Sequence, residues 1–316
     1  MATLRPVTTE RAASPAPAGK RQRSFAHWVL LTPAGLVMLI VTVAPIIFLI
    51  VVSFTDYNKR SLFTGAYNNV GLVQYTGLFA DPDFWQSLLR TLLLTVALVA
   101  GSVLIGTGVA QLLTRLGTVL RYTVTIVLVL AWAMPNVASS LVWKWLFEPG
   151  YGVVNWMLTK LGIFGDMTSV DWSNNATLAY LSIWMLVVWQ AVPFIALTVY
   201  AALIQVPAET QEAARMDGAG EWQVWRTVVL PFLRPTLLLV TILSVIWDFN
   251  VFNQIWLVSF GGPDDATTTL GVYAYKVAFI GFKVGQGAAI SVITTLLLVI
   301  LTSVYIRNLL RSGEDL

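Results

Sequence analysis

The sequence predicts an all-α integral membrane protein with six transmembrane helices. Hydrophobic residues make up 57% of its 316 residues and charged residues only 11%, and the mean hydropathy is +0.75. A soluble domain carries roughly 25% charged residues. Six apolar runs are long enough to cross about 30 Å of hydrocarbon. Lipid is therefore the expected solvent for most of this chain.

The composition also excludes several kinds of site. The chain has no cysteine and a single histidine, which rules out disulfides, thiolate metal sites and multi-histidine metal sites. His27 lies beside the first apolar run, where we expect an interfacial residue. The basic pI of about 9.2 comes without a basic stripe of interleaved aromatics, so nucleic-acid binding is not indicated.

Residues 1–24 are rich in Ala, Pro, Ser and basic residues, and predict a flexible tail. Residues 25–316 form the predicted transmembrane domain. The first apolar run, 28–53, is too long for a signal-peptide core and lacks a suitable cleavage site, so we expect it to remain as a membrane helix. The other expected spans are 88–113, 122–145, 176–203, 236–258 and 288–306.

An even number of spans places both termini on the same side of the membrane. Twelve of the nineteen Lys and Arg residues fall on the side of the termini, which predicts that the termini are cytoplasmic. The loops 55–87, 146–175 and 259–286 then lie outside and are expected to be short ordered caps.

A polar stretch separates the fourth and fifth spans: "ETQEAARMDGAGEWQVWRTVVLP", residues 209–231. Pro207 suits the first turn of a helix, and the glycines of "DGAG" suit the positive φ angles that end one. Trp222 and Trp225 then lie on one face of a second short helix. We expect Pro231 and Pro235 to bend the chain into the fifth span. An interfacial helix lying on lipid headgroups is the alternative.

Seven positions in this stretch resemble the "EAA" signature of ABC importer permeases. They are Glu212, Ala213, Ala214, Gly218, Val228, Leu230 and Pro231. Only Val228, in place of Ile, departs from the family pattern. The resemblance implies that loop 205–231 carries a cytoplasmic coupling helix that docks on a separate ATPase subunit. The implied ATPase-coupling residues are Glu212, Ala213, Ala214, Asp217, Gly218 and Ala219.

A second stretch, residues 251–279, resembles carbohydrate-type permeases, with Gly-Gly-Pro followed by a Thr-rich, strand-like loop. With the "PI" and "SFTDY" of the first span, it resembles the larger, maltose-permease-like membrane subunit of sugar importers. The resemblance covers roughly residues 28–310. It implies a type I ABC importer permease fold in a bacterial cell membrane. The implied partners are a second related permease in a heterodimer, two copies of an ATP-binding subunit and an extracytoplasmic sugar-binding protein.

Polar groups inside membrane spans are costly and call for a reason. Asp248 is the only acid inside the expected spans and lies near the middle of the fifth, and Gln190 lies near the middle of the fourth. Gln190 and Asp248 are placed at matching depth in consecutive spans, which suggests a small site near the midplane. Aromatic rings suit a sugar, whose C–H faces pack on rings while its hydroxyls form hydrogen bonds. The aromatic residues expected around this site are Trp184, Trp189, Phe194, Trp247 and Trp256.

Carried over from maltose-type permeases, the substrate-lining positions fall on Gln190, Ala191 and Phe194 of the fourth span. Those of the fifth span fall on Ser244, Trp247, Asp248 and Val251, with Asn250 adjacent. Several of these residues differ from the maltose pattern, so the location of the site is better supported than its substrate. A helix–helix hydrogen bond is the alternative role for Asp248.

We expect no enzymatic activity and no cofactor, because no phosphate loop of the form G-x-x-x-x-G-K-[ST] occurs in the chain. ATP hydrolysis is expected on a partner subunit. The Gly-rich pieces "GSVLIGTG" and "GFKVGQG" are better explained as helix-packing and loop residues. One alternative is an ion-coupled secondary carrier that uses Asp248. Another is a membrane enzyme acting on lipid-linked sugars. Such an enzyme needs paired acids or a metal cluster at the interface, and the outer loops carry acids but no histidine.

Overall fold

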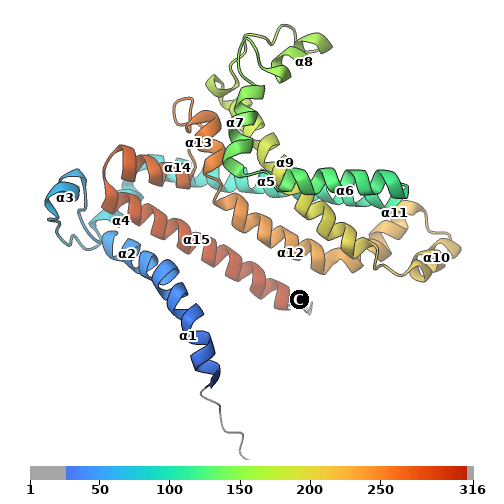
Figure 1. Ribbon diagram of the computed structural model, residues 1–316, viewed down its shortest axis with the longest axis horizontal. Helices are drawn as coiled ribbons and strands as arrows, with labels where there is room; N and C mark the ends of the chain where they lie inside the picture. Colours follow the sequence, from blue (N-terminus) through green and yellow to red (C-terminus); the bar gives the residue numbers. More distant parts are fainter. Residues whose placement is uncertain (1–25, 312–316) are drawn as a thin grey trace, which may run out of the picture. The chain divides into compact units, whose positions relative to one another are not determined.

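The computed structural model describes the backbone of residues 26–311 and the side chains of residues 31–307. The predicted tail, residues 1–24, and the side chain of His27 lie outside these ranges. Within the described backbone the protein is helical, and the only β-type pairing is an isolated bridge between Thr55 and Asn69 (Figure 1). The predicted all-α fold is therefore confirmed.

The chain divides into two compact units, one ending at Phe48 and the other beginning at Leu49. The first span consists of α1 (Ala26–Met38), the π-helical turn η1 (Leu39–Val43) and α2 (Ala44–Val52). Residues Leu31–Val52 form one helix that is long and apolar enough to cross a membrane. The predicted first span, 28–53, is confirmed.

Helices α5 (Pro82–Arg115) and α9 (Ala176–Leu203) pack against each other in the second unit. Glycines of α5 allow the close approach: a Cβ atom added at Gly101 would lie 2.5 Å from the ring of Trp184, and one at Gly106 would lie 2.7 Å from Ile195. The indole nitrogen of Trp184 donates a hydrogen bond of 2.9 Å to the carbonyl of Ala97. The packing role predicted for "GSVLIGTG" is confirmed.

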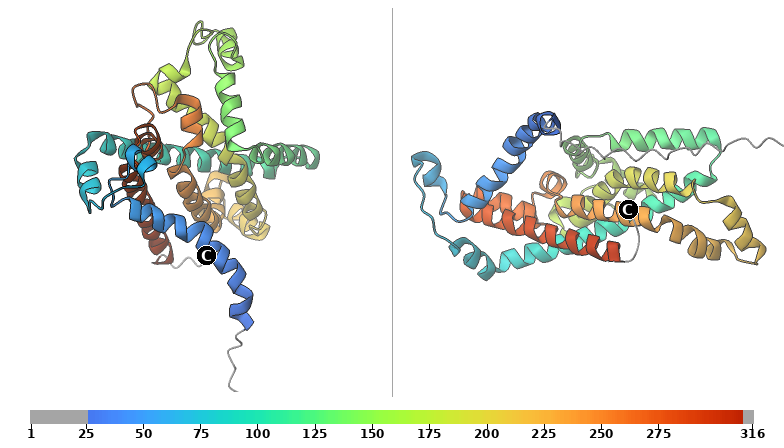
Figure 2. Two further views of the ribbon diagram at one scale, coloured as in Figure 1. Left: turned by 60° about the vertical axis from the view of Figure 1, so that its left-hand side comes forward. Right: turned by 90° about the horizontal axis from the view of Figure 1, so that it is seen from below.

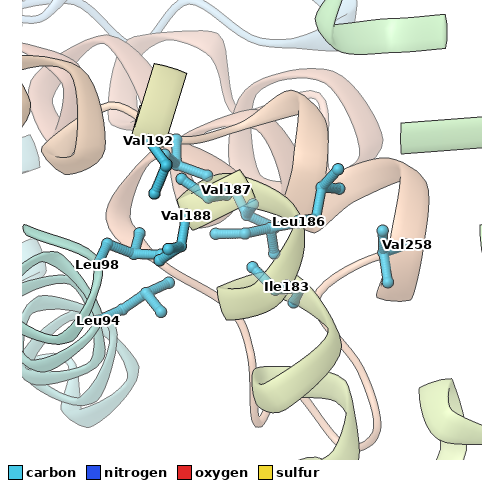
Figure 3. Close-up of a cluster of buried hydrophobic side chains, with 11 residues drawn as sticks. Leu94, Leu98, Ile183, Leu186, Val187, Val188, Val192 and Val258 are labelled. Atoms are coloured by element: carbon cyan, nitrogen blue, oxygen red, sulfur yellow. The ribbon is translucent and has the colours of Figure 1, made fainter. Parts of the chain in front are cut away.

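One cluster of buried aliphatic side chains joins α5, α9 and α13 (Asn253–Ser259). Figure 3 shows Leu94 and Leu98 of α5 facing Val188 of α9, with Val258 of α13 on the other side of α9. In a membrane such side chains stabilise helix contacts through van der Waals packing rather than through removal from water. The cluster therefore fixes α9 between two elements that are far apart in sequence.

The third predicted span is broken. Residues 122–145 form two helices, α6 (Thr118–Trp132) and α7 (Asn136–Leu146), which are bent by 100° relative to each other. Pro135 lies at the break, with an extended ψ of 136°. A proline lacks an amide hydrogen and disfavours helical geometry in the residue before it, so the first helix ends ahead of Pro135. The expectation of one continuous helix here is wrong.

The fifth predicted span, 236–258, ends early. Helix α12 (Leu230–Phe249) stops before a short linker, and α13 begins at Asn253. At the break, the side-chain amide of Asn250 donates a hydrogen bond of 3.0 Å to the carbonyl of Ile246. Asparagine favours helix ends because its side chain competes with the backbone for hydrogen bonds. Asp248 thus lies in the last turn of a helix rather than near its middle.

The beginning of this span also differs from the prediction. Helix α11 (Glu221–Val224), the π-helical turn η3 (Trp225–Val229) and α12 form one helical run, Glu221–Phe249. Pro231 lies in the first turn of α12, where the loss of an amide hydrogen is tolerated. Instead of a proline bend into the span, the chain has a wider helical turn at Trp225–Val229.

The predicted outer loops contain short helices: α3 (Lys59–Thr64), α4 (Val73–Ala80), α8 (Val153–Leu161), η2 (Trp172–Asn174) and α14 (Leu270–Tyr275) with η4 (Lys276–Ile280). The Thr-rich segment is not strand-like. Thr267 and Thr268 donate hydrogen bonds to the carbonyls of Gly262 and Gly261, and this closes a compact loop before α14.

The last helix, α15 (Val284–Arg311), covers the predicted span 288–306. It lies beside α12 in both views of Figure 2. In the described part of the chain, five helices are long and apolar enough to cross a membrane, or six if the bent pair α6–α7 counts as one span.

Candidate functional site

A cavity of about 520 Å³ lies where the two helix breaks meet α9. Its walls come from the break between α6 and α7, the middle of α9, the end of α12 and the start of α13. The lining residues are Trp132, Met134, Asn136, Val187, Gln190, Ala191, Phe194, Ile246, Trp247, Asp248, Asn250, Val251, Phe252, Asn253 and Gln254. Discontinuous helices that line a cavity are typical of substrate sites in membrane transporters.

Seven of the eight predicted substrate-binding residues line this cavity: Gln190, Ala191, Phe194, Trp247, Asp248, Asn250 and Val251. Ser244 does not. It is buried one helical turn before Asp248 on α12. The structure therefore brings the predicted set together around one space, while its role in binding substrate stays a prediction.

A chain of amide hydrogen bonds crosses the cavity wall. Gln190 donates a hydrogen bond of 2.8 Å to the hydroxyl of Ser139 and lies 3.3 Å from the side-chain oxygen of Asn136. Its own carbonyl oxygen accepts a hydrogen bond of 2.9 Å from Gln254. One side chain of α9 thus holds the first turns of both α7 and α13.

Three stacked or edge-on rings form the aromatic part of the wall. Trp132 stacks on Phe194 at 6.2 Å between ring centroids, and Phe194 meets Trp247 edge to face at 5.3 Å. Together they give an aromatic surface beside the amides. Such pairs stabilise a fold by about 0.5–1.5 kcal/mol beyond the area that they bury.

The three other tryptophans expected around the site do not line it. Trp184 packs on Gly101 of α5. Trp189 packs on Trp143, with 5.8 Å between ring centroids. Trp256 stacks on Phe252 at 6.0 Å. Sequence position alone did not give the direction in which each ring points, because that depends on helix packing.

Asp248 is an unusual member of the wall. Its side chain is buried, with 6% exposed, and its Oδ2 atom has no hydrogen-bond partner among the described residues. The predicted alternative of a helix–helix hydrogen bond through this atom is therefore not seen. Because a buried polar atom normally has a partner, the Oδ2 atom of Asp248 is left uncompensated by the described residues.

Asn136, Gln254 and Trp132 belong to the cavity but were missed from the sequence. The pair Pro135-Asn136 signals a helix break inside an apolar run. Gln254 and Asn253 are further polar residues inside the predicted fifth span. This cluster of amide side chains soon after Asp248 is the sequence signal of the second helix break.

The polar stretch between α9 and α12 folds as predicted, with a short helix, α10 (Ala208–Met216). Pro207 lies at its N-cap and Glu209 in its first turn. At its end, Gly218 has φ of +86°. The amides of Ala219 and Gly218 donate hydrogen bonds of 3.0 Å to the carbonyls of Ala214 and Arg215. This Schellman motif is the usual way to end a helix with a glycine.

The predicted ATPase-coupling residues gather on this turn. Glu212, Ala213, Asp217 and Gly218 are exposed, and Ala214 and Ala219 are partly buried. Large apolar side chains beside them are also exposed: Met216 by 87% and Trp222 by 71%. Trp222 stacks on Trp225 at 5.3 Å, which confirms that the two share a face. Arg215 and Glu221 form an exposed ion pair of 3.0 Å.

Comparison with known protein families identifies the family of this chain. Residues 102–312 match the family described as "Binding-protein-dependent transport system inner membrane component". The chain belongs to this family. It is therefore a multi-pass membrane component of a transport system, and the ion-coupled secondary carrier is not favoured.

Two relatives cover most of the permease. It is 39% identical over 298 residues to the diacetylchitobiose uptake system permease protein DasB of Streptomyces coelicolor, covering 94% of this chain and 90% of the relative. It is 31% identical over 279 residues to the sulfoquinovosyl glycerol transport system permease protein SmoG of Agrobacterium fabrum, covering 88% of each chain.

A solved structure shares the fold. A chain of a bacterial ABC transporter that imports the acidic polysaccharide alginate matches with a TM-score of 0.77 and 18% identity, covering 93% of this chain and 98% of the other. The predicted type I ABC importer permease fold is thus confirmed.

Proposed function

We propose that this permease forms half of the translocation pathway of an ATP-driven sugar importer. The chemistry of the cavity carries the proposal. Amide groups of Gln190, Asn250 and Asn253 border the rings of Trp132, Phe194 and Trp247. Sugars bind to such walls, since their hydroxyls need hydrogen bonds and their C–H faces pack on rings. The names of DasB and SmoG, which both refer to sugar compounds, support the same class.

The proposed assembly contains four kinds of component. A second, related permease pairs with this chain and completes the pathway. Two copies of an ATP-binding subunit dock on the cytoplasmic side, and an extracytoplasmic binding protein delivers the sugar. Membership of a binding-protein-dependent family supports the last partner. The excess of Lys and Arg on one side supports an orientation with both termini in the cytoplasm. The bacterial origin of DasB and SmoG supports a bacterial cell membrane as the location.

The exposed turn around Gly218 serves in this proposal as the docking site for the ATPase, within loop 205–231. Met216 and Trp222 offer an apolar surface, and Glu212 and Asp217 offer charge. Protein interfaces commonly combine an apolar centre with a polar rim. A helix lying on lipid headgroups would instead carry a Lys/Arg-rich polar face, whereas α10 carries acidic and basic residues together.

Coupling follows from the continuity of one helical run. Residues Glu221–Phe249 form 29 helical residues, which at 1.5 Å per residue span roughly 43 Å. This run begins beside the docking turn and ends at Asp248 in the cavity wall. A displacement of the docking turn by ATP-driven closure therefore moves the cavity wall as well.

Reconstitution of the whole importer tests the function. Vesicles are prepared with both permeases, the ATPase and the binding protein. They should take up labelled diacetylchitobiose or a related sugar only when ATP is present on the side of the membrane that carries the ATPase. Uptake driven by an ion gradient without nucleotide would refute the proposal in favour of a secondary carrier.

A further inference from the structure

The wall of the cavity carries a single formal charge. Asp248 is the one acidic residue among the described residues that line the cavity, and none of them is Lys, Arg or His. The other strongly polar side chains are neutral amides: Asn136, Gln190, Asn250, Asn253 and Gln254. A ligand in this space therefore meets one carboxyl group with no basic side chain of this chain beside it.

The position of Asp248 makes its carboxylate costly to the fold. It is almost fully buried, and its Oδ2 atom has no partner among the described residues. It also lies in the last turn of α12, where the helix dipole places partial negative charge and disfavours a carboxylate. Packing in the fold alone gives no reason for an acid at this position.

The neighbouring amides do not compensate for it. Gln190 is engaged with Ser139, Asn136 and Gln254, and the side-chain nitrogen of Asn250 is bonded to the carbonyl of Ile246. These groups hold the broken helices in place. Asp248 is thus the member of the wall whose carboxyl group is not held by a neighbouring side chain through its Oδ2 atom.

We propose that Asp248 makes the cavity selective for sugars without negative charge. This inference rests on the proposed function. The carboxyl group of Asp248 accepts a hydrogen bond from a sugar hydroxyl or from the ammonium of an amino sugar, and in its ionised form it repels carboxylated or sulfonated sugars in a low-dielectric cavity. The fold does not impose this choice, because the solved chain with the same fold belongs to an importer of an acidic polysaccharide.

A charge series of disaccharides tests the inference. The purified transporter complex, with both permeases and the ATPase but without binding protein, is placed in nanodiscs. Binding is followed by the fluorescence of the cavity tryptophans, Trp132 and Trp247. The probes are neutral N,N′-diacetylchitobiose, cationic chitobiose and anionic dimannuronate. The first two should bind, and the anion should bind at least about tenfold more weakly.

Variants assign the discrimination to one carboxylate. Asp248→Asn should bring the affinity for dimannuronate close to that for the neutral sugar, and should weaken binding of the cationic sugar by about tenfold. Asp248→Glu keeps the charge and should keep the exclusion. Asp264→Asn removes an acid from an exposed turn outside the cavity and should change nothing.

Equal binding of all three probes by the wild type would overturn the charge selection and leave the sugar function standing. Unchanged discrimination in an assembled Asp248→Asn complex would overturn the role of this residue. Failure of the wild type to bind any probe would count against the sugar function and this inference together. If Asp248→Asn does not assemble, Asp248→Ser replaces it, and unchanged discrimination in that variant overturns the role of Asp248.

Discussion

The side-chain nitrogen of Gln254 lies 2.9 Å from the carbonyl oxygen of Gln190, although 64 residues separate them in the sequence. Gln190 also donates a hydrogen bond to the hydroxyl of Ser139, in the first turn of α7. A single glutamine thus ties together the two helices that restart beside the cavity. Replacing Gln190 should lower the free energy of unfolding as well as the rate of transport.

Replacing Gln190 by Leu should lower the free energy of unfolding by about 1–3 kcal/mol, because Ser139 and Gln254 lose their hydrogen-bond partner in a partly buried place. Thermal unfolding of the purified permease pair measures the change. Gln86→Leu is the matched control, since it removes only an exposed hydrogen bond to Arg90. Equal stability of the two variants would contradict the bracing role of Gln190.

Gly218 and Gly220 form a natural pair for testing the docking turn. A Cβ atom would meet nothing within 4 Å at either site, but only Gly218 has a positive φ. Gly218→Ala should therefore strain the turn by about 1–2 kcal/mol, whereas Gly220→Ala should be tolerated. ATPase co-purification and ATP-driven uptake should fall only for the first variant. The same loss in both would show that backbone geometry is not the cause.

Glu212 tests the chemistry of the same surface. Glu212→Lys reverses the charge of an exposed side chain, so the permease should stay folded while it loses the ATPase. Pull-down of the ATPase and the unfolding temperature are measured together. Glu209→Lys, in the first turn of α10, is the control and should cost only about 0.3–1 kcal/mol of helix stability. Full ATPase binding by Glu212→Lys would argue against the proposed docking site.

Two glycines of α5 test helix packing. Gly101→Ala would place a methyl group 2.5 Å from Trp184, while Gly108 has open space around it. The first substitution should destabilise the permease by about 1–3 kcal/mol through overpacking. The second should stabilise α5 by up to about 1 kcal/mol, because alanine favours helices over glycine. Chemical or thermal unfolding in detergent separates them, and a neutral Gly101→Ala would show that α5 and α9 pack loosely.

The long apolar helices were predictable because hydropathy reports directly on them. Residues 176–203 were predicted as a span, and α9 has the same bounds. The docking turn was equally accessible, since its glycine and its charges act locally. Both features are determined by local sequence and can be predicted without knowledge of the rest of the fold.

The helix breaks were harder to predict. Hydropathy is blind to a backbone that stops being helical while its side chains stay apolar, as around Pro135. Cavity membership also depends on position along the helix axis: Ser244 lies one turn before Asp248 on the same face of α12 and is outside the wall. Trp184 turns away because its indole bonds to the carbonyl of Ala97. Such side-chain orientations depend on contacts with residues that are distant in the sequence, and hydropathy does not predict those contacts.

The two helix breaks, at 133–135 and 250–252, have a consequence for electrical insulation. Peptide groups released from helical hydrogen bonding cannot be left facing hydrocarbon, so irregular backbone at membrane depth is tolerated where it is buried in protein or lines a water-filled space. Because the cavity lined by Met134 and Val251 adjoins both breaks, we expect it to hold water when no sugar is bound. Every state of the transport cycle has to seal that water on at least one side, or protons and ions will leak through the idle importer.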